Sequence, residues 1–364
     1  MTARAELRAL TGVRGIAAWW VVLYHIRLSI AGLPPFWLAL FAKGYLAVDF
    51  FFLLSGFVLW LSWNDRLRSG GIGALPGFLW RRLARIWPLH LFMLACATAL
   101  ALALAAIGKG DAQAFPFAAL PLHILLLQNL GFTDRLAWND PSWSISTEWA
   151  AYILFPVLAI VLDWRRVPTA GIVAAIVALG VLLHAAMAGA PTLGTDIWSL
   201  GLRRCLIEFV MGTATYALWS RYRTTPIGPA VVALFVFGGA VTACALGTRE
   251  TLVLPCGCAA GLLALALTSG LPGNPLAAPL LHRLGEISYA TYLGHFLLFV
   301  VVKLVLVRDA HAVPPPVIAL YLALVLASSV VLYSCVEQPA QERMNRLAKT
   351  WRAGSRRHAS AVSS

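Results

Sequence analysis

Long apolar segments constrain the fold of this chain more than any other feature of its sequence. A helix needs about 20 predominantly apolar residues to cross the hydrocarbon core of a bilayer, and segments of that kind recur from near the N-terminus to residue 336. Of all residues 60% are hydrophobic and 12% are charged, whereas soluble domains carry about 45–50% and about 25%. The sequence therefore excludes an ordinary soluble enzyme and predicts an all-α, polytopic integral membrane protein.

Ten segments meet the length requirement for a membrane-spanning helix. We place them at residues 9–31, 44–63, 86–107, 143–162, 169–189, 203–219, 228–246, 251–270, 288–307 and 317–336. An eleventh apolar run, 117–130, is too short to span and has Pro116 and Pro121 near its start. We interpret it as a re-entrant or interfacial segment.

The basic residues predict the orientation. With the N-terminus inside, 18 of the 28 Lys and Arg residues lie in inner loops and tails, 8 lie outside and 2 lie within spans. Cytoplasmic loops carry an excess of these residues, so the distribution favours ten spans with both termini cytoplasmic. The net charge of +13 then reflects topology and not nucleic-acid binding. We expect one transmembrane domain over residues 1–340 and a basic, disordered cytoplasmic tail over 341–364.

The cysteines give no sign of a metal centre. All six lie in or beside apolar runs, and Cys256 and Cys258 form a lone Cys-x-Cys without a nearby histidine or acidic partner. Such an isolated pair is typical of small buried residues. We therefore expect no metal site.

Two ionisable residues share the first predicted span. Charged groups are costly inside a membrane and mark functional candidates. Arg14 and His25 are 11 residues apart, which is three helical turns plus about 20°, so their side chains share one face about 16 Å apart along the axis. The alternative is that Arg14 extends to the inner interface and His25 is an ordinary buried histidine.

Two carboxylates are predicted at the depth of this histidine. Asp49 in the second span and Glu148 in the fourth lie, like His25, about 8–9 Å below the outer surface at the helical rise of about 1.5 Å per residue. A histidine beside carboxylates is what general-base catalysis on a hydroxyl group requires. The same residues also suit a proton relay, and a packing role for Asp49 remains open.

The inner loop between the second and third spans carries a pair of arginines. On a helix, Arg82 and Arg85 share a face, and two guanidinium groups together suit a phosphate or pyrophosphate. The alternative is positive charge that only sets topology. In the ninth span, the hydroxyl groups and the histidine of residues 288–295 either line a pore or bond between helices.

Six short segments follow one another in the order of a known family. They are residues 14–25, from Arg-Gly-Ile-Ala-Ala to Tyr-His; 44–57, with Asp-Phe-Phe-Phe-Leu-Leu-Ser-Gly-Phe; 81–88, Arg-Arg-Leu-Ala-Arg-Ile-Trp-Pro; 141–148, Pro-Ser-Trp-Ser-Ile-Ser-Thr-Glu; 284–296, with Gly-Glu-Ile-Ser-Tyr and Tyr-Leu-Gly-His-Phe; and 336–339, Val-Glu-Gln-Pro. In these segments the sequence resembles the acyltransferase 3 family of bacterial integral-membrane O-acyltransferases.

The resemblance implies an activity. Members of this family are ten-span proteins that move an acyl group, often acetyl, from acyl-CoA to a hydroxyl group of a carbohydrate or another acceptor. It implies that His25 is the catalytic histidine, that Arg14 is its partner in an Arg-x10-His motif, and that Arg82 and Arg85 help to bind acyl-CoA. It also implies a location in the bacterial inner membrane.

The sequence thus predicts a complete site. We assign catalysis to His25, Glu148 and Asp49, and binding of the co-substrate acyl-CoA, in the first place acetyl-CoA, to Arg14, Arg82 and Arg85. The expected acceptor is a carbohydrate or a glycolipid. The competing hypothesis is a proton-coupled secondary transporter or a lipid-linked sugar carrier. The family motifs argue against this hypothesis, as does the absence of a detectable sequence repeat. Direct transfer and transfer through a serine of the fourth span both remain open.

Overall fold

The computed structural model describes residues 7–187, 189–307, 309 and 312–348. Within these ranges the chain is helical, and its extended pairing is limited to one isolated β-bridge between Ile30 and Val313. The α-helices are α1 (Arg8–Ile26), α2 (Pro35–Ala42), α3 (Leu46–Ala106), α4 (Leu120–Ile124), α5 (Ser142–Val161), α6 (Thr169–Ala186), α7 (Ile197–Tyr222), α8 (Ile227–Ala245), α9 (Glu250–Thr268), α10 (Pro279–Glu286), α11 (Ser288–Leu306) and α12 (Pro315–Leu332). Short 3₁₀ turns are η1 (Arg27–Ser29), η2 (Phe117–Ala119) and η3 (Pro275–Ala277), and η4 (Tyr333–Glu337) is a π-helical turn.

The helices confirm the predicted class. Eight helical segments in the described part of the chain are long and apolar enough to cross a membrane. One of them contains α3, which covers two predicted spans, 44–63 and 86–107. The predicted span 203–219 lies inside α7, which is not among the eight. The all-helical membrane architecture is therefore confirmed, and ten spans stay a prediction. Residues 117–130 form only the short helices η2 and α4 and irregular chain.

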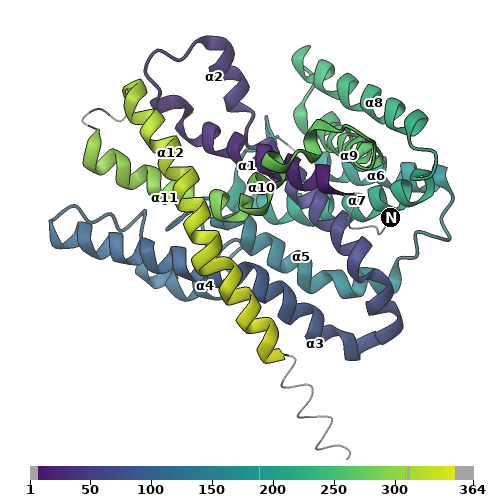
Figure 1. Ribbon diagram of the computed structural model, residues 1–364, viewed down its shortest axis with the longest axis horizontal. Helices are drawn as coiled ribbons and strands as arrows, with labels where there is room; N and C mark the ends of the chain where they lie inside the picture. The colour runs from purple at the N-terminus through teal and green to yellow at the C-terminus, as the bar shows by residue number, and fades with distance from the viewer. Residues whose placement is uncertain (1–6, 188, 308, 310–311, 349–364) are drawn as a thin grey trace, which may run out of the picture.

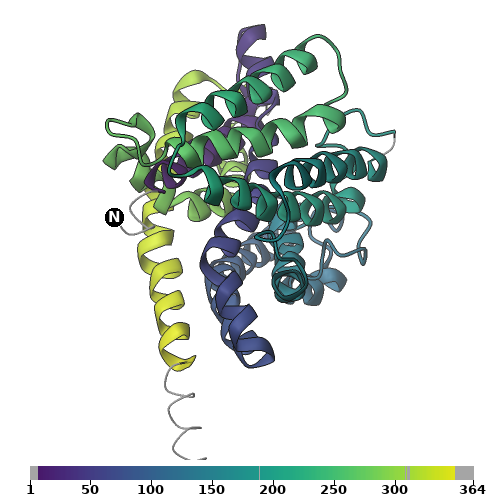
Figure 2. The same cartoon turned by 90° about the vertical axis from the view of Figure 1, so that its right-hand side faces the viewer.

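Helix α3 consists of two arms that meet at an elbow. Gly71 has φ +52° and ψ −143° there, a conformation that glycine adopts because it has no Cβ. From the elbow, the second arm runs back across the lower part of the molecule towards α4 (Figure 1). The view in Figure 2 shows the two arms converging at the lower end of the molecule. This turn brings residues of the second arm, including the predicted arginine pair, beside α1 and α5.

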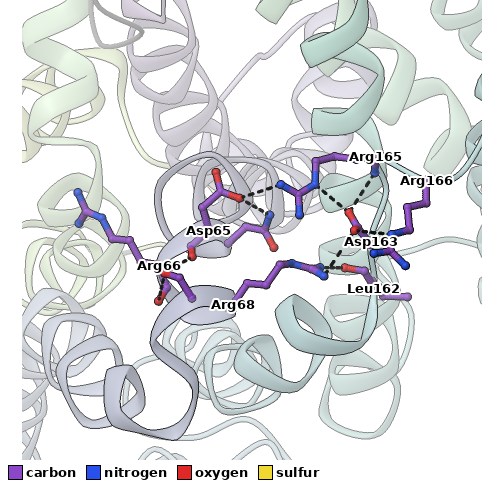
Figure 3. A network of polar contacts seen from close by, with 9 residues as sticks. Asp65, Arg66, Arg68, Leu162, Asp163, Arg165 and Arg166 are labelled. Carbon is purple, nitrogen blue, oxygen red and sulfur yellow. Dashed lines mark hydrogen bonds and ion pairs between the residues drawn. The ribbon is translucent and has the colours of Figure 1, made fainter.

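Charged side chains tie the elbow to the loop between α5 and α6. We call them the elbow cluster: Asp65, Arg68, Asp163, Arg165 and Arg166 (Figure 3). Asp163 is its centre, 2.9 Å from Arg165, 3.3 Å from Arg166 and 3.7 Å from Arg68. The hydrogen bond from Arg165 lowers the pKa of Asp163 below its ordinary value. The cluster thus links the end of the first arm of α3 to the loop that follows α5.

Glycines let α1 pack closely against the segment that precedes α11. A Cβ atom at Gly285 would lie 1.8 Å from the carbonyl oxygen of Thr11, and one at Gly12 would lie 2.1 Å from that of Leu276. No larger residue fits at either position without moving a backbone, so small residues set this helix spacing, as in other membrane bundles. The close approach fixes α1 against α10 and places its polar side chains beside the start of α11.

The C-terminal helix continues past α12. The helical segment runs from Pro315 through η4 to Ala348, and it forms the long yellow helix in Figure 1. Residues 341–348, which we predicted to be disordered, are therefore helical. The rest of the predicted tail, 349–364, lies outside the described residues.

Candidate active site

A cavity of about 190 Å³ lies between α1, α3, α5 and α11. Its polar lining comes from five separate parts of the chain: Arg14; Ser55; Arg82 and Arg85; Ser144, Glu148 and Tyr152; and Ser288, Tyr289 and Tyr292. Phenylalanine, leucine, isoleucine and valine side chains supply the remaining wall. A mostly apolar cavity with a few converging polar groups is the usual form of a small-molecule site.

The three predicted binding arginines all line this cavity, but their partners differ. Arg85 forms an ion pair with Glu337 at the end of η4, whose side chain is 1% exposed. Arg14 donates to the Ser288 hydroxyl at 3.1 Å. Arg82 packs over the Tyr152 ring, 6.0 Å from its centroid, and its Nε has no hydrogen-bond partner. Within the described ranges, neither Arg14 nor Arg82 has an ion pair.

Glu148 faces the same cavity and is held by two hydroxyl groups. It accepts hydrogen bonds from Ser55 at 2.7 Å and from Tyr152, one turn later on α5, at 2.5 Å. These two hydrogen bonds hold the carboxylate between α3 and α5. Glu148 therefore lies with the arginines and not against His25.

His25 lies at the last turn of α1 and is not among the residues that line this cavity. Its Nδ1 is 3.0 Å from the Val21 carbonyl oxygen and 3.1 Å from Nε2 of His295 on α11. Its Nε2 lies 3.6 Å from Oδ2 of Asp140, two residues before the start of α5. The imidazole side chain is 15% exposed, so it is shielded but reachable.

Two hydroxyl groups in the cavity wall lie on the side of the histidines. The Tyr292 hydroxyl lies 2.8 Å from Ser144 Oγ, and both residues line the cavity. Tyr292 is one turn before His295 on α11, and their ring centroids are 6.3 Å apart. The polar lining of the cavity thus extends from the arginines and Glu148 to Ser144 and Tyr292, and His295 follows one turn after Tyr292 without lining the cavity itself.

Asp49 has a different environment from the one its depth predicted. Both of its carboxylate oxygens accept hydrogen bonds from Arg204 of α7, and the two side chains are 0% and 1% exposed. The predicted grouping placed Asp49 at the depth of His25 and Glu148, but each of the three has its own partners. Arg204 belongs to the eight basic residues that the charge count places outside, at the start of the predicted span 203–219. It lies inside α7, because this helix begins at Ile197, six residues before the predicted span.

Sequence reasoning missed Asp140 as the carboxylate beside His25 and left the role of His295 open. Asp140 falls just outside the apolar segment of α5, so a search for charges inside spans passed over it. The signal available in the sequence was its position directly before the Pro-Ser-Trp-Ser motif. The described residues contain no group of three His, Cys, Asp or Glu side chains arranged to hold a metal ion.

Comparison with known proteins agrees with these features. Residues 7–334 match the acyltransferase domain that defines the acyltransferase 3 family. Acyltransferase MdmB of Streptomyces mycarofaciens is 30% identical over 325 residues, which cover 80% of this chain and 79% of that protein. Peptidoglycan O-acetyltransferase OatA of Listeria monocytogenes is 24% identical over 236 residues, which cover 62% of this chain and 36% of that protein. No solved structure matches the chain. Because the family match spans nearly its whole length, the chain belongs to the acyltransferase 3 family.

Proposed function

We propose that this protein transfers an acyl group, acetyl in the first place, from cytoplasmic acyl-CoA to a hydroxyl group of a carbohydrate or glycolipid. The observation that carries the proposal is the cavity that joins Arg14, Arg82 and Glu148 to the hydroxyl groups of Ser144 and Tyr292, one turn before His295, the partner of His25. Family membership supports acyl transfer, and the arginines support a phosphorylated donor.

The donor would enter from the arginine end. Arg82 and Arg14 have no carboxylate partner among the described residues, so their charges are available to phosphate oxygens. A cavity of about 190 Å³ is smaller than the roughly 300–1,000 Å³ of a pocket that encloses a drug-sized ligand. We infer that only the acyl-pantetheine end enters, and that the nucleotide stays at the cytoplasmic mouth near Arg82.

The acceptor would approach from the His25 end. His25 removes the proton of the acceptor hydroxyl while its oxygen attacks the thioester carbon. The C–S bond then breaks, the CoA sulfur leaves with the bonding electrons, and it receives a proton, so that an ester and free CoA are the products. Asp140 stabilises the imidazolium that forms during the attack, because a carboxylate attracts only the charged form of the ring.

The proposed setting is the inner membrane of a bacterium, with both termini in the cytoplasm. The excess of basic residues in the loops of one side supports this orientation. It places the mouth of the cavity at the side where CoA occurs and His25 near the opposite surface.

Mass spectrometry of cell-surface glycans and lipids tests the function. A strain without the gene should lose one acylated species, which the wild-type gene restores and a His25→Gln gene does not. The variant keeps a polar side chain but cannot take up the proton. If the wild-type protein instead carries a solute across the membrane and no acylated product depends on it, the competing transporter hypothesis is correct.

A further inference from the structure

We infer that His295 is a positioning residue that holds His25 in the tautomer with its proton on Nδ1, so that Nε2 is the atom that accepts the proton of the substrate. The inference rests on the proposed role of His25 as general base. It assigns a task to a residue whose role the sequence left open, and it identifies the reacting nitrogen.

The first step concerns His295 itself. Its side chain is buried, and its Nδ1 lies 3.1 Å from the carbonyl oxygen of Thr291, one turn earlier on α11. A carbonyl oxygen only accepts, so Nδ1 of His295 carries the proton. A neutral imidazole has one N–H group, and the described contacts include no carboxylate that would pair with a buried imidazolium here. Nε2 of His295 is therefore an acceptor.

The second step transfers this constraint to His25. Nε2 of His295 is 3.1 Å from Nδ1 of His25, and the carbonyl oxygen of Val21 is 3.0 Å from the same atom. Two acceptors thus converge on one ring nitrogen, which must carry a proton to satisfy either. An unprotonated Nδ1 would place its lone pair against both acceptors. Two partners from two helices, α1 and α11, consequently favour the same tautomer of His25.

The third step concerns the opposite side of the ring. Asp140 Oδ2 lies 3.6 Å from Nε2 of His25, which is beyond the range of a hydrogen bond. The neutral ring therefore presents a free lone pair on that side. When Nε2 takes the proton from an acceptor hydroxyl, the new N–H faces a carboxylate. Asp140 then stabilises the charged ring more than the neutral one, which is the difference that accelerates a reaction.

The competing arrangement is well defined. Asp140 would draw the proton of His25 to Nε2, Nδ1 would accept from a proton on Nε2 of His295, and the carbonyl groups of Val21 and Thr291 would both lose their side-chain donors. Two contacts of 3.0 and 3.1 Å stand against one of 3.6 Å. The shorter contacts decide in favour of the proton on Nδ1.

Nitrogen NMR of the full-length protein in lipid nanodiscs tests the tautomer without any substrate. The chain has eight histidines, which would be labelled with ¹⁵N, and the signals of His25 and His295 would be identified by their loss in His25→Gln and His295→Gln. At about pH 8.5, where ordinary imidazoles are neutral, we expect a protonated Nδ1 and an aprotic Nε2 on His25. A proton on Nε2 of His25 in the wild type overturns the inference.

Kinetics of two replacements at 295 separate positioning from mere packing. His295→Leu removes the acceptor, and we expect kcat to fall about 2- to 10-fold, the equivalent of one lost neutral hydrogen bond, with an unchanged KM for acyl-CoA. His295→Gln offers an amide oxygen to Nδ1–H and should recover part of the loss. Equal kcat in wild type and in a folded His295→Leu protein contradicts the inference.

A buried histidine elsewhere supplies the control. His90 on α3 is equally buried and also bonds a backbone carbonyl, that of His123 at 2.8 Å. His90→Leu should leave the His25 spectrum unchanged. If His295→Leu does not fold, the wild-type spectrum alone still shows which nitrogen of His25 carries the proton. If the wild-type spectrum shows the expected tautomer and no acyl transfer is found, the tautomer assignment holds and the proposed function fails.

Discussion

Asp140 and His25 face one another across a gap of 3.6 Å between Oδ2 and Nε2, at a point where α5 begins and α1 ends. We predict that Asp140→Asn lowers kcat by about 10- to 100-fold, because it removes the charge that stabilises a protonated imidazole. A hydrogen bond to a charged group is worth about 1.5–3 kcal/mol, and each 1.36 kcal/mol changes a rate tenfold. Steady-state kinetics at saturating donor and acceptor measure the loss. A variant with normal kcat would show that this carboxylate takes no part.

Replacement of His25 should abolish transfer while donor binding persists. For His25→Gln we expect a fall of about 10²- to 10⁴-fold in kcat, the usual contribution of a positioned base. Acyl-CoA should bind as before, since the arginines lie at the other end of the cavity. Equilibrium binding of acyl-CoA and product formation, measured on one preparation, check both parts. Near-normal acylation by this variant excludes His25 as the base.

Arg82 should affect the donor and not the acceptor. Its guanidinium lines the cavity without an ion-pair partner among the described residues, so Arg82→Ala should raise the KM for acyl-CoA and leave that for the acceptor unchanged. Arg82→Lys should rescue only in part, because lysine lacks the planar fork that grips two phosphate oxygens. An unchanged KM for acyl-CoA in the folded alanine variant would show that Arg82 does not bind the donor and contributes only to the charge bias that sets topology.

Arg85 should behave differently from Arg82. It pairs with the buried Glu337, and removal of one partner of a buried pair costs about 3–5 kcal/mol. Arg85→Met should therefore lower the midpoint of thermal unfolding, and Glu337→Gln added to it should restore most of the loss. The KM for acyl-CoA should be measured in both variants. If it rises in Arg85→Met but not in the more stable double variant, the kinetic effect comes from impaired folding. A single variant as stable as wild type would contradict the pairing.

The orientation can be tested independently of chemistry. Reporter fusions at residues 66–80 and after residue 341 should indicate the cytoplasm, and fusions at 190–200 the outside. Residues 66–80 contain the elbow of α3, whose basic side chains belong to the inner set of the charge distribution. A reporter that places this loop outside would reverse the proposed path of both substrates.

Much of the helical architecture follows from the sequence, because apolar segments of membrane length are hard to mistake. The two spans inside α3 and the short helices at 117–130 lie where segment length indicates. The start of α7 lies six residues before the predicted span 203–219, because Arg203 and Arg204, which the charge count placed outside, are part of this helix. A buried arginine is tolerated there because Asp49, on another helix, forms an ion pair with it.

Side-chain partners are harder to predict than helices. Depth along a helix follows from residue counting, but the direction of a side chain depends on how neighbouring helices pack. Asp49 and Glu148 have similar predicted depths, yet one pairs with Arg204 and the other with Ser55 and Tyr152. The carboxylate that does face His25 lies just outside a span, where the search for buried charges did not reach.

Some of the residues that meet at the candidate site are translated early and others late. Arg14 bonds Ser288, 274 positions later, and His25 meets His295 after 270. At about 5–20 residues per second, a ribosome needs roughly 14–55 s to cover that distance. The first helix therefore enters the membrane long before its partners exist, and no nascent chain that ends before α11 can assemble the two histidines. The site is therefore complete only after α11 has been made.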